Sequence, residues 1–157
     1  MLRLSKKADY ALIAMRHLAG GEAGSSASAR EIAESYAIPP ELLAKVLQRL
    51  VRAGLLVSVQ GTRGGYKLVR DAHRMTVADV IQAIDGPVAV TACSPDDHAC
   101  EQFEHCEIRD PLWKIKSRIV DALATVSLAE LAEPPAPAPA APLVMHTALR
   151  AQAAAGK

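Results

Sequence analysis

The chain has 157 residues, a formal net charge of +1 and a composition that is half apolar but only 3% aromatic. A chain of this length can bury a core without disulfides, and many aliphatic residues with few aromatic ones favour packed helices over a sheet. No apolar run approaches the roughly 20 residues of a membrane-spanning helix. The N-terminus also lacks the apolar core of a secretory signal, so we expect a cytoplasmic protein.

The small net charge hides a separation of charge along the chain. Residues 1–74 contain twelve Lys and Arg against six Asp and Glu, whereas residues 75–110 contain one Arg against eight Asp and Glu. A basic first half is typical of a protein that binds a polyanion. An ordinary solvated surface can give the same counts, so charge alone does not separate it from a polyanion-binding surface.

Capping signals mark the beginnings of the first two helices. Ser5 is placed to cap a helix over residues 6–19, whose apolar residues recur at helical spacing and form one buried stripe. Ser28 and Glu31 form a capping box, in which each side chain satisfies a backbone amide of the other residue. They predict a short second helix that ends at about Tyr36.

A third helix and a hairpin follow. Pro40 suits the first turn of a helix, because the amide proton that proline lacks would have no partner there. The β-prone runs 55–59 and 66–69 flank a Gly-rich segment and predict a β-hairpin. Helix, short turn, helix and hairpin in this order are typical of a winged helix-turn-helix DNA-binding domain, which we assign to residues 1–74.

The remainder divides into three parts. Residues 75–109 are expected to hold a connecting helix and a cysteine loop, and residues 110–133 a long amphipathic helix. The apolar stripe of that helix would pair with a second copy in a homodimer, although packing within one chain is the commoner fate of such a stripe. Residues 134–157 are rich in Pro and Ala and are expected to be disordered. The expected fold class is mainly α, with a β-hairpin wing, a cysteine loop and a C-terminal dimerisation helix.

The second helix of a helix-turn-helix pair enters the major groove, so its outward-facing residues are candidate DNA contacts. Lys45 and Gln48 are best placed to touch base edges, while Arg49 and Arg52 suit phosphates. At the wing tip, Arg63 suits a narrow minor groove. A helical protein with a tight glycine turn and no nucleic acid is the alternative. The candidate DNA-binding residues are Glu41, Lys45, Gln48, Arg49, Arg52, Gln60, Thr62 and Arg63.

The three cysteines, Cys93, Cys100 and Cys106, lie within fourteen residues. Thiols stay reduced in the cytoplasm, where grouped cysteines more often indicate metal or redox chemistry than disulfides. Thiolates are the usual ligands of iron–sulfur clusters, and three of them leave one position for a fourth ligand. Structural zinc favours tighter Cys-x₂₋₄-Cys spacing, so a zinc site fits less well. A thiol switch, or three free thiols in a loop, would also account for the group.

Three strings in the sequence resemble the bacterial iron–sulfur regulator family that includes IscR and NsrR. They are residues 4–12 of the first helix, residues 53–68 around the hairpin and residues 77–87 before the cysteines. The resemblance covers about residues 1–133 and is nearest to the branch that regulates SUF iron–sulfur assembly, which shares the spacing Cys-x₆-Cys-x₅-Cys. It implies a dimeric winged-helix repressor or activator that binds double-stranded DNA at a roughly palindromic operator and holds one [2Fe–2S] or [4Fe–4S] cluster per subunit.

The resemblance also bears on the fourth ligand. In the nitric-oxide-sensing branch this ligand is an aspartate on the first helix of the partner subunit, and Asp9 occupies that place here. In the IscR branch it is a histidine three residues after the third cysteine, where this chain has Arg109. Asp9 is therefore the first candidate, followed by His98 and His105. The plain alternative for Asp9 is a helix-surface carboxylate that balances neighbouring lysines.

The expected function is a transcriptional regulator that senses an iron–sulfur cluster and controls SUF iron–sulfur assembly genes. A nitric-oxide-sensing iron–sulfur repressor and a zinc- or thiol-bearing winged-helix interaction protein are the alternatives. No enzymatic activity is expected, because no nucleophile–base pairing is evident. In addition, the glycine-rich residues 61–65 lack the Lys-Ser/Thr of a phosphate-binding loop.

Overall fold

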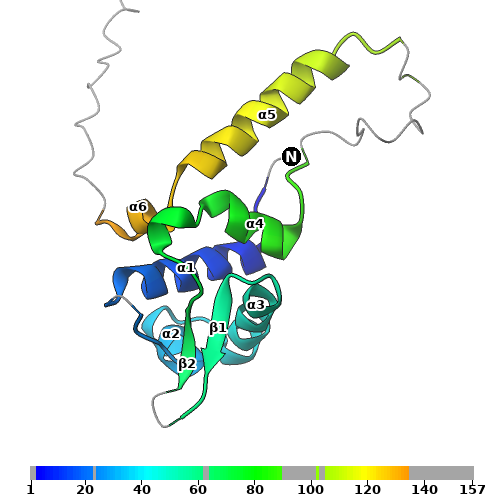
Figure 1. The fold of residues 1–157 in the computed structure, drawn as a ribbon. Helices are drawn as coiled ribbons and strands as arrows, with labels where there is room; N and C mark the ends of the chain where they lie inside the picture. The colour runs from blue at the N-terminus through cyan, green and yellow to red at the C-terminus, as the bar shows by residue number, and fades with distance from the viewer. Residues whose placement is uncertain (1–2, 23, 62–63, 90–101, 103–104, 135–157) are drawn as a thin grey trace, which may run out of the picture.

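Helices build most of the described part of the molecule, and a β-hairpin extends from one end of it (Figure 1). The computed structural model describes residues 3–22, 24–61, 64–89, 102 and 105–134. In chain order these residues form α1 (Lys6–Gly20), α2 (Ala29–Ser35), α3 (Pro40–Arg52), β1 (Leu56–Val59), β2 (Gly65–Leu68), the 3-10 helix η1 (Ala72–Arg74), α4 (Val77–Asp85), α5 (Arg109–Thr125) and α6 (Leu128–Ala132).

The expected caps are present at the helix starts. The hydroxyl of Ser5 accepts a hydrogen bond from the amide of Ala8 at 3.1 Å, which satisfies one of the amides left over in the first turn of α1. The capping box of Ser28 and Glu31 is formed at the start of α2, and Thr76 forms an equivalent one at the start of α4. The predictions for Ser5 and for Ser28 with Glu31 are confirmed. Each of these caps depends on residues only three positions apart, so its signal is visible in the sequence.

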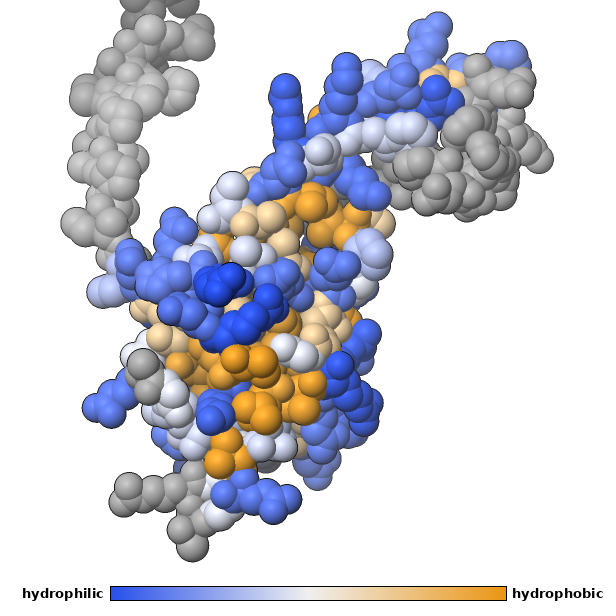
Figure 2. Space-filling view, in the orientation of Figure 1, coloured by the Kyte–Doolittle hydropathy of each residue, from blue (hydrophilic) through white to orange (hydrophobic). Residues whose placement is uncertain are grey.

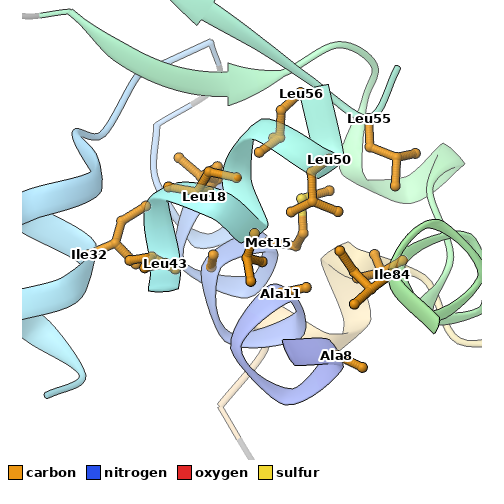
Figure 3. Close-up of a cluster of buried hydrophobic side chains, with 14 of the residues drawn as sticks. Ala8, Ala11, Met15, Leu18, Ile32, Leu43, Leu50, Leu55, Leu56 and Ile84 are labelled. Atoms are coloured by element: carbon orange, nitrogen blue, oxygen red, sulfur yellow. The ribbon is translucent and has the colours of Figure 1, made fainter. Parts of the chain in front are cut away.

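The core is built around α1, which packs against α3, α4 and α6. The short side chains of Ala8, Ala11 and Ala14 are fully buried and let the neighbouring helices approach α1 closely (Figure 3). Met15 and Leu18 extend the same buried stripe. The predicted apolar stripe of α3 is buried at every position, namely Leu43, Val46, Leu47 and Leu50.

The hairpin is antiparallel, with Leu56 opposite Leu68 and Val59 opposite Gly65. Its base is tied to the segment before α2, because the amide of Ala27 donates to the carbonyl of Tyr66 at 3.1 Å and the amide of Tyr66 donates back at 2.9 Å. A Cβ atom on Gly65 would lie 2.3 Å from the carbonyl oxygen of Ala27. Only glycine therefore fits this approach of two backbones.

The α5 helix extends away from the helical body, and α6 then returns to it (Figure 1). No residue of α5 is buried, and Ile115 on the expected dimerisation stripe is 47% exposed. By contrast, Leu128 of α6 is fully buried in the core. Neither η1 nor α6 was predicted from the sequence. Across the described residues, no helix is both long and apolar enough to cross a membrane.

Candidate nucleic-acid interface and cysteine segment

The outer face of α3 carries the polar residues that the sequence pattern places there. Lys45, Gln48 and Arg52 are exposed, as are Glu41 and Arg49, while the opposite side of the helix is buried in the core. The turn before α3 is held by the amide of Ile38, which donates to the carbonyl of Ala33 at 3.0 Å. The helix is therefore fixed by its buried side and presents cations and an amide to solvent.

The wing projects from the same part of the molecule as α3, at the end opposite α5 (Figure 1). Gln60 is exposed near its tip. Thr62 and Arg63 lie outside the described residues, so their candidate DNA contacts stay predictions. The bridge between Ala27 and Tyr66 holds the base of the wing against the segment that leads into α2. The wing and the helix-turn-helix pair are thus joined by backbone hydrogen bonds as well as by the chain.

Arg49 has a contact that its sequence position did not predict. Its Nε donates a hydrogen bond to the carbonyl oxygen of Ala83 in α4 at 3.1 Å. The sequence pattern assigns Arg49 to a phosphate, but this bond directs one guanidinium nitrogen toward the neighbouring helix. A second long-range contact joins Asp85 of α4 to Ser5 at the start of α1. No sequence signal could have revealed either pair, because the partners are 34 and 80 residues apart.

Of the three cysteines, only Cys106 falls within the described residues, where it is half-buried just before α5. Cys93, Cys100 and the alternative ligand His98 lie outside them. His105 is described and exposed. In the part of the chain that the structure describes, no three His, Cys, Asp or Glu residues gather as a metal site. The candidate ligand set therefore stays a prediction.

Asp9 lies in the first turn of α1, where its carboxylate is 3.9 Å from the ammonium of Lys6 and its side chain is 44% exposed. Such an exposed ion pair contributes little to stability, on the order of 0–1 kcal/mol. The pairing agrees with the plain interpretation of Asp9 as a surface carboxylate. It also leaves the carboxylate accessible to a second subunit.

The first turns of α5, which follow Cys106 in the sequence, carry a cation and a buried hydrogen-bond donor. The indole Nε1 of Trp113 is buried and has no hydrogen-bond acceptor among the described residues. The guanidinium of Arg109 stacks on the ring of Trp113, 5.3 Å from its centroid. A buried donor without an acceptor is costly, and sulfur ligands of a cluster accept hydrogen bonds that tune their properties. Arg109 and Trp113 follow Cys106 by three and seven residues in the sequence, and the guanidinium of Arg109 also pairs with the carboxylate of Asp110 at 2.9 Å. A cation and a donor therefore lie at the start of the helix that follows the third cysteine, which is compatible with the thiolate-bound cluster expected from the sequence.

The α3 helix, held against a buried core, and the β-hairpin attached to it define a winged helix-turn-helix transcriptional regulator. We call α3 the reading helix. The chain belongs to the Rrf2 family, described as iron-dependent transcriptional regulators, whose family model matches residues 4–134. It is 36% identical over 131 residues to the HTH-type transcriptional regulator IscR of Xenorhabdus nematophila, an alignment that covers 83% of this chain and 79% of that protein. The family resemblance is confirmed, and so is the expected fold class of a mainly helical protein with a β-hairpin wing. The relatives are named as transcriptional regulators and not as enzymes, which confirms that expectation as well.

Solved structures with the same fold include two kinds of regulator. CymR, the global cysteine regulator of B. subtilis, superposes with a TM-score of 0.70 at 26% identity, covering 84% of this chain and 97% of CymR. IscR of T. potens superposes with a TM-score of 0.65 at 27% identity, covering 83% of this chain and 85% of that protein. The same fold is thus shared by regulators with different names, one of them a global cysteine regulator.

Proposed function

We propose that this protein is a cytoplasmic, homodimeric regulator whose affinity for a roughly palindromic operator depends on an iron–sulfur cluster, and that it controls SUF iron–sulfur assembly genes. One observation carries the proposal: α3 is buried along one side and exposes Lys45, Gln48 and Arg52 along the other. A buried side fixes the helix, and an exposed polar side is what a base-reading helix requires.

The DNA contacts follow from this geometry. Lys45 and Gln48 would reach base edges in the major groove, and Arg52 would meet a phosphate near the end of α3. Arg63 on the wing would enter the minor groove. Pairing of α5 with its copy would present two reading helices to successive half-sites, about 34 Å apart. The support for that pairing is that α5 projects from the body with Ile115 47% exposed.

Cys93, Cys100 and Cys106 would hold the cluster, with Asp9 of the partner subunit as the first candidate for the fourth ligand. Bound there, a [2Fe–2S] or [4Fe–4S] cluster would supply a centre that responds to iron supply, oxidation or nitric oxide. The chain's own contribution is to place three cysteines in one acidic segment, to follow the last of them with Arg109 and Trp113 at the start of α5, and to hold Asp9 on the first turn of α1.

Anaerobic purification followed by visible spectroscopy and by iron and sulfide analysis tests the cluster. We expect a coloured protein whose absorption is lost in Cys106→Ala and altered in Asp9→Ala. An Asp9→Ala spectrum identical to that of the wild type would remove Asp9 from the ligand set. A colourless protein with stoichiometric zinc would instead support the zinc-bearing interaction protein.

Footprinting of cluster-loaded and cluster-free protein on genomic fragments tests the regulatory role. We expect protection upstream of SUF genes that differs between the two forms. Protection that is released only by nitric oxide would favour the nitric-oxide-sensing repressor. Failure of both forms to retain any fragment would contradict the proposal.

A further inference from the structure

Three consecutive residues at the C-terminal end of α4 contact two other helices. Ala83 contacts α3 through its carbonyl oxygen, Ile84 is buried in the core, and Asp85 contacts the start of α1 through its carboxylate. We call these three residues the α4 junction. Gly86 follows directly, with a left-handed φ of 84° that turns the chain out of the helix toward the cysteine segment. The α4 junction is therefore the point at which that segment is attached to the body.

The contact with α1 is made by both oxygens of one carboxylate. Oδ2 of Asp85 accepts a hydrogen bond from the amide of Ser5 at 3.0 Å, and Oδ1 accepts one from the hydroxyl of Ser5 at 2.5 Å. The same hydroxyl caps α1 by accepting from the amide of Ala8. A carboxylate at a helix N-terminus is favoured by the helix dipole as well. Asp85 thus sets the position of the first turn of α1, which carries Asp9.

The contact with α3 is made by Arg49, which lies on the same helix as the candidate base-reading residues. Its Nε donates to the carbonyl of Ala83 at 3.1 Å. The carbonyl lies near the C-terminus of α4, where backbone oxygens lack helical partners and a cation is electrostatically favoured. Arg49 therefore ties the reading helix to the α4 junction.

Ile84 makes the α4 junction stiff. Its side chain is 3% exposed and faces Ala8 and Ala11 of α1 in the core (Figure 3). Close-packed interiors transmit displacement because they contain little free volume. A shift of the α4 junction is therefore passed to α1 through Ile84 and Asp85, and to α3 through Arg49.

Resting on the function proposed above, we propose that Arg49 and Asp85 are positioning residues that couple the cysteine segment to the DNA-reading helix. Arg49 acts by tying α3 to the α4 junction and not by neutralising a phosphate. Asp85 acts by holding the start of α1, with Asp9, against the same junction. Any change that reaches Gly86 from the cysteine segment then alters the placement of α3 and of the partner's candidate ligand together.

The test compares Arg49→Met with the matched control Arg52→Met. Both variants remove one exposed cation from α3, but the Nε bond to Ala83 is lost only in the first. The affinity of cluster-loaded and cluster-free protein is measured by fluorescence anisotropy, on a duplex selected with the wild-type protein from a randomised library, over a series of salt concentrations. The readouts are the ratio of the two affinities and the slope of log affinity against log salt.

In Arg49→Met, we expect the affinities of the cluster-loaded and cluster-free forms to differ at least about threefold less than in the wild type. The dependence of log affinity on log salt should keep its wild-type slope. Arg52→Met should keep the ratio and lose about 0.9 from the slope, as removal of one phosphate contact does. The proposal would be overturned if Arg49→Met made the salt dependence shallower and left the affinity ratio of the two forms unchanged. That result would show that Arg49 contacts a phosphate. A wild-type ratio of one would overturn the proposed function as well, so the two failures are distinguishable.

Hydrogen exchange tests the role of Asp85 without a cluster. In cluster-free Asp85→Asn, whose side chain cannot accept both bonds from Ser5, we expect faster exchange in the first turn of α1 than in the wild type. Exchange in α2 serves as the internal reference, because the hydrogen bonds of the Asp85 carboxylate go to Ser5 and not to α2. An unchanged first turn would show that Asp85 does not hold α1.

The hydropathy of the surface differs between the helical body and the projecting helix. Apolar side chains gather over the helical body, while the helix that projects from it carries mostly hydrophilic ones on the face shown (Figure 2). The α4 junction belongs to the packed body, because Ile84 is buried there.

Discussion

Replacing Leu128 with alanine is expected to lower the free energy of unfolding by about 3 kcal/mol, within the roughly 2–5 kcal/mol typical of buried Leu→Ala changes. Leu128 is fully buried and belongs to the same core cluster as α1 and α3. The substitution removes three carbons, worth about 0.8 kcal/mol each in transfer from water, or about 2.4 kcal/mol in total. The remainder comes from the cavity that the core cannot refill.

Urea unfolding followed by circular dichroism, at one fixed protein concentration because the protein is proposed to dimerise, measures this loss. The matched control is Leu4→Ala, the same chemical change at a side chain that is 39% exposed, with an expected loss of about 1.5 kcal/mol and no added cavity cost. A Leu128→Ala loss no larger than that of the control would refute the reasoning. It would mean that α6 is not part of the cooperative core.

Three further predictions concern the wing, a cap and the dimer. Gly65→Ala should weaken DNA binding, because its Cβ would collide with the carbonyl of Ala27 and push the wing away; Gly20→Ala, whose Cβ would meet nothing closer than 3.8 Å, is the control in the same gel-shift assay. Thr76→Ala should destabilise the protein by about 1 kcal/mol through loss of the capping box, a loss that thermal unfolding can measure and that Thr76→Ser should largely avoid. Ile115→Glu should shift the protein from dimer to monomer in light scattering, whereas Ser117→Glu, an exposed change on the other side of α5, should not; a dimeric Ile115→Glu would place the interface elsewhere.

The sequence predicted the elements whose signals are local. Ser28 with Glu31 marks α2, and the apolar spacing of α3 is sufficient to separate its buried side from its exposed side. The α6 helix was missed although Ser127 caps it and Glu130 follows three residues later, the usual local sign of a helix start. A helix of five residues is not stable alone and depends on the burial of Leu128, which no local pattern reports.

Only part of the candidate DNA-binding site could be predicted from the sequence. The exposed face of α3 could be predicted from periodicity, because a helix fixed by one buried side must expose the other. The role of Arg49 could not be, because its position on the helix surface suits a phosphate as well as the carbonyl of Ala83. Asp85 gave no signal, because a carboxylate at the end of one helix can cap the start of another only after the chain has folded.

Backbone hydrogen bonds close the chain on itself on either side of α4 and α5. The amide of Val77 donates to the carbonyl of Val126 at 3.0 Å, and the amide of Leu128 donates to the carbonyl of Met75 at 2.8 Å. The residues just before α4 and just after α5 are therefore held side by side, while α4 itself is packed against α1. Because these bonds join the two ends, the C-terminal end of α5 cannot shift without also displacing the residues that begin α4.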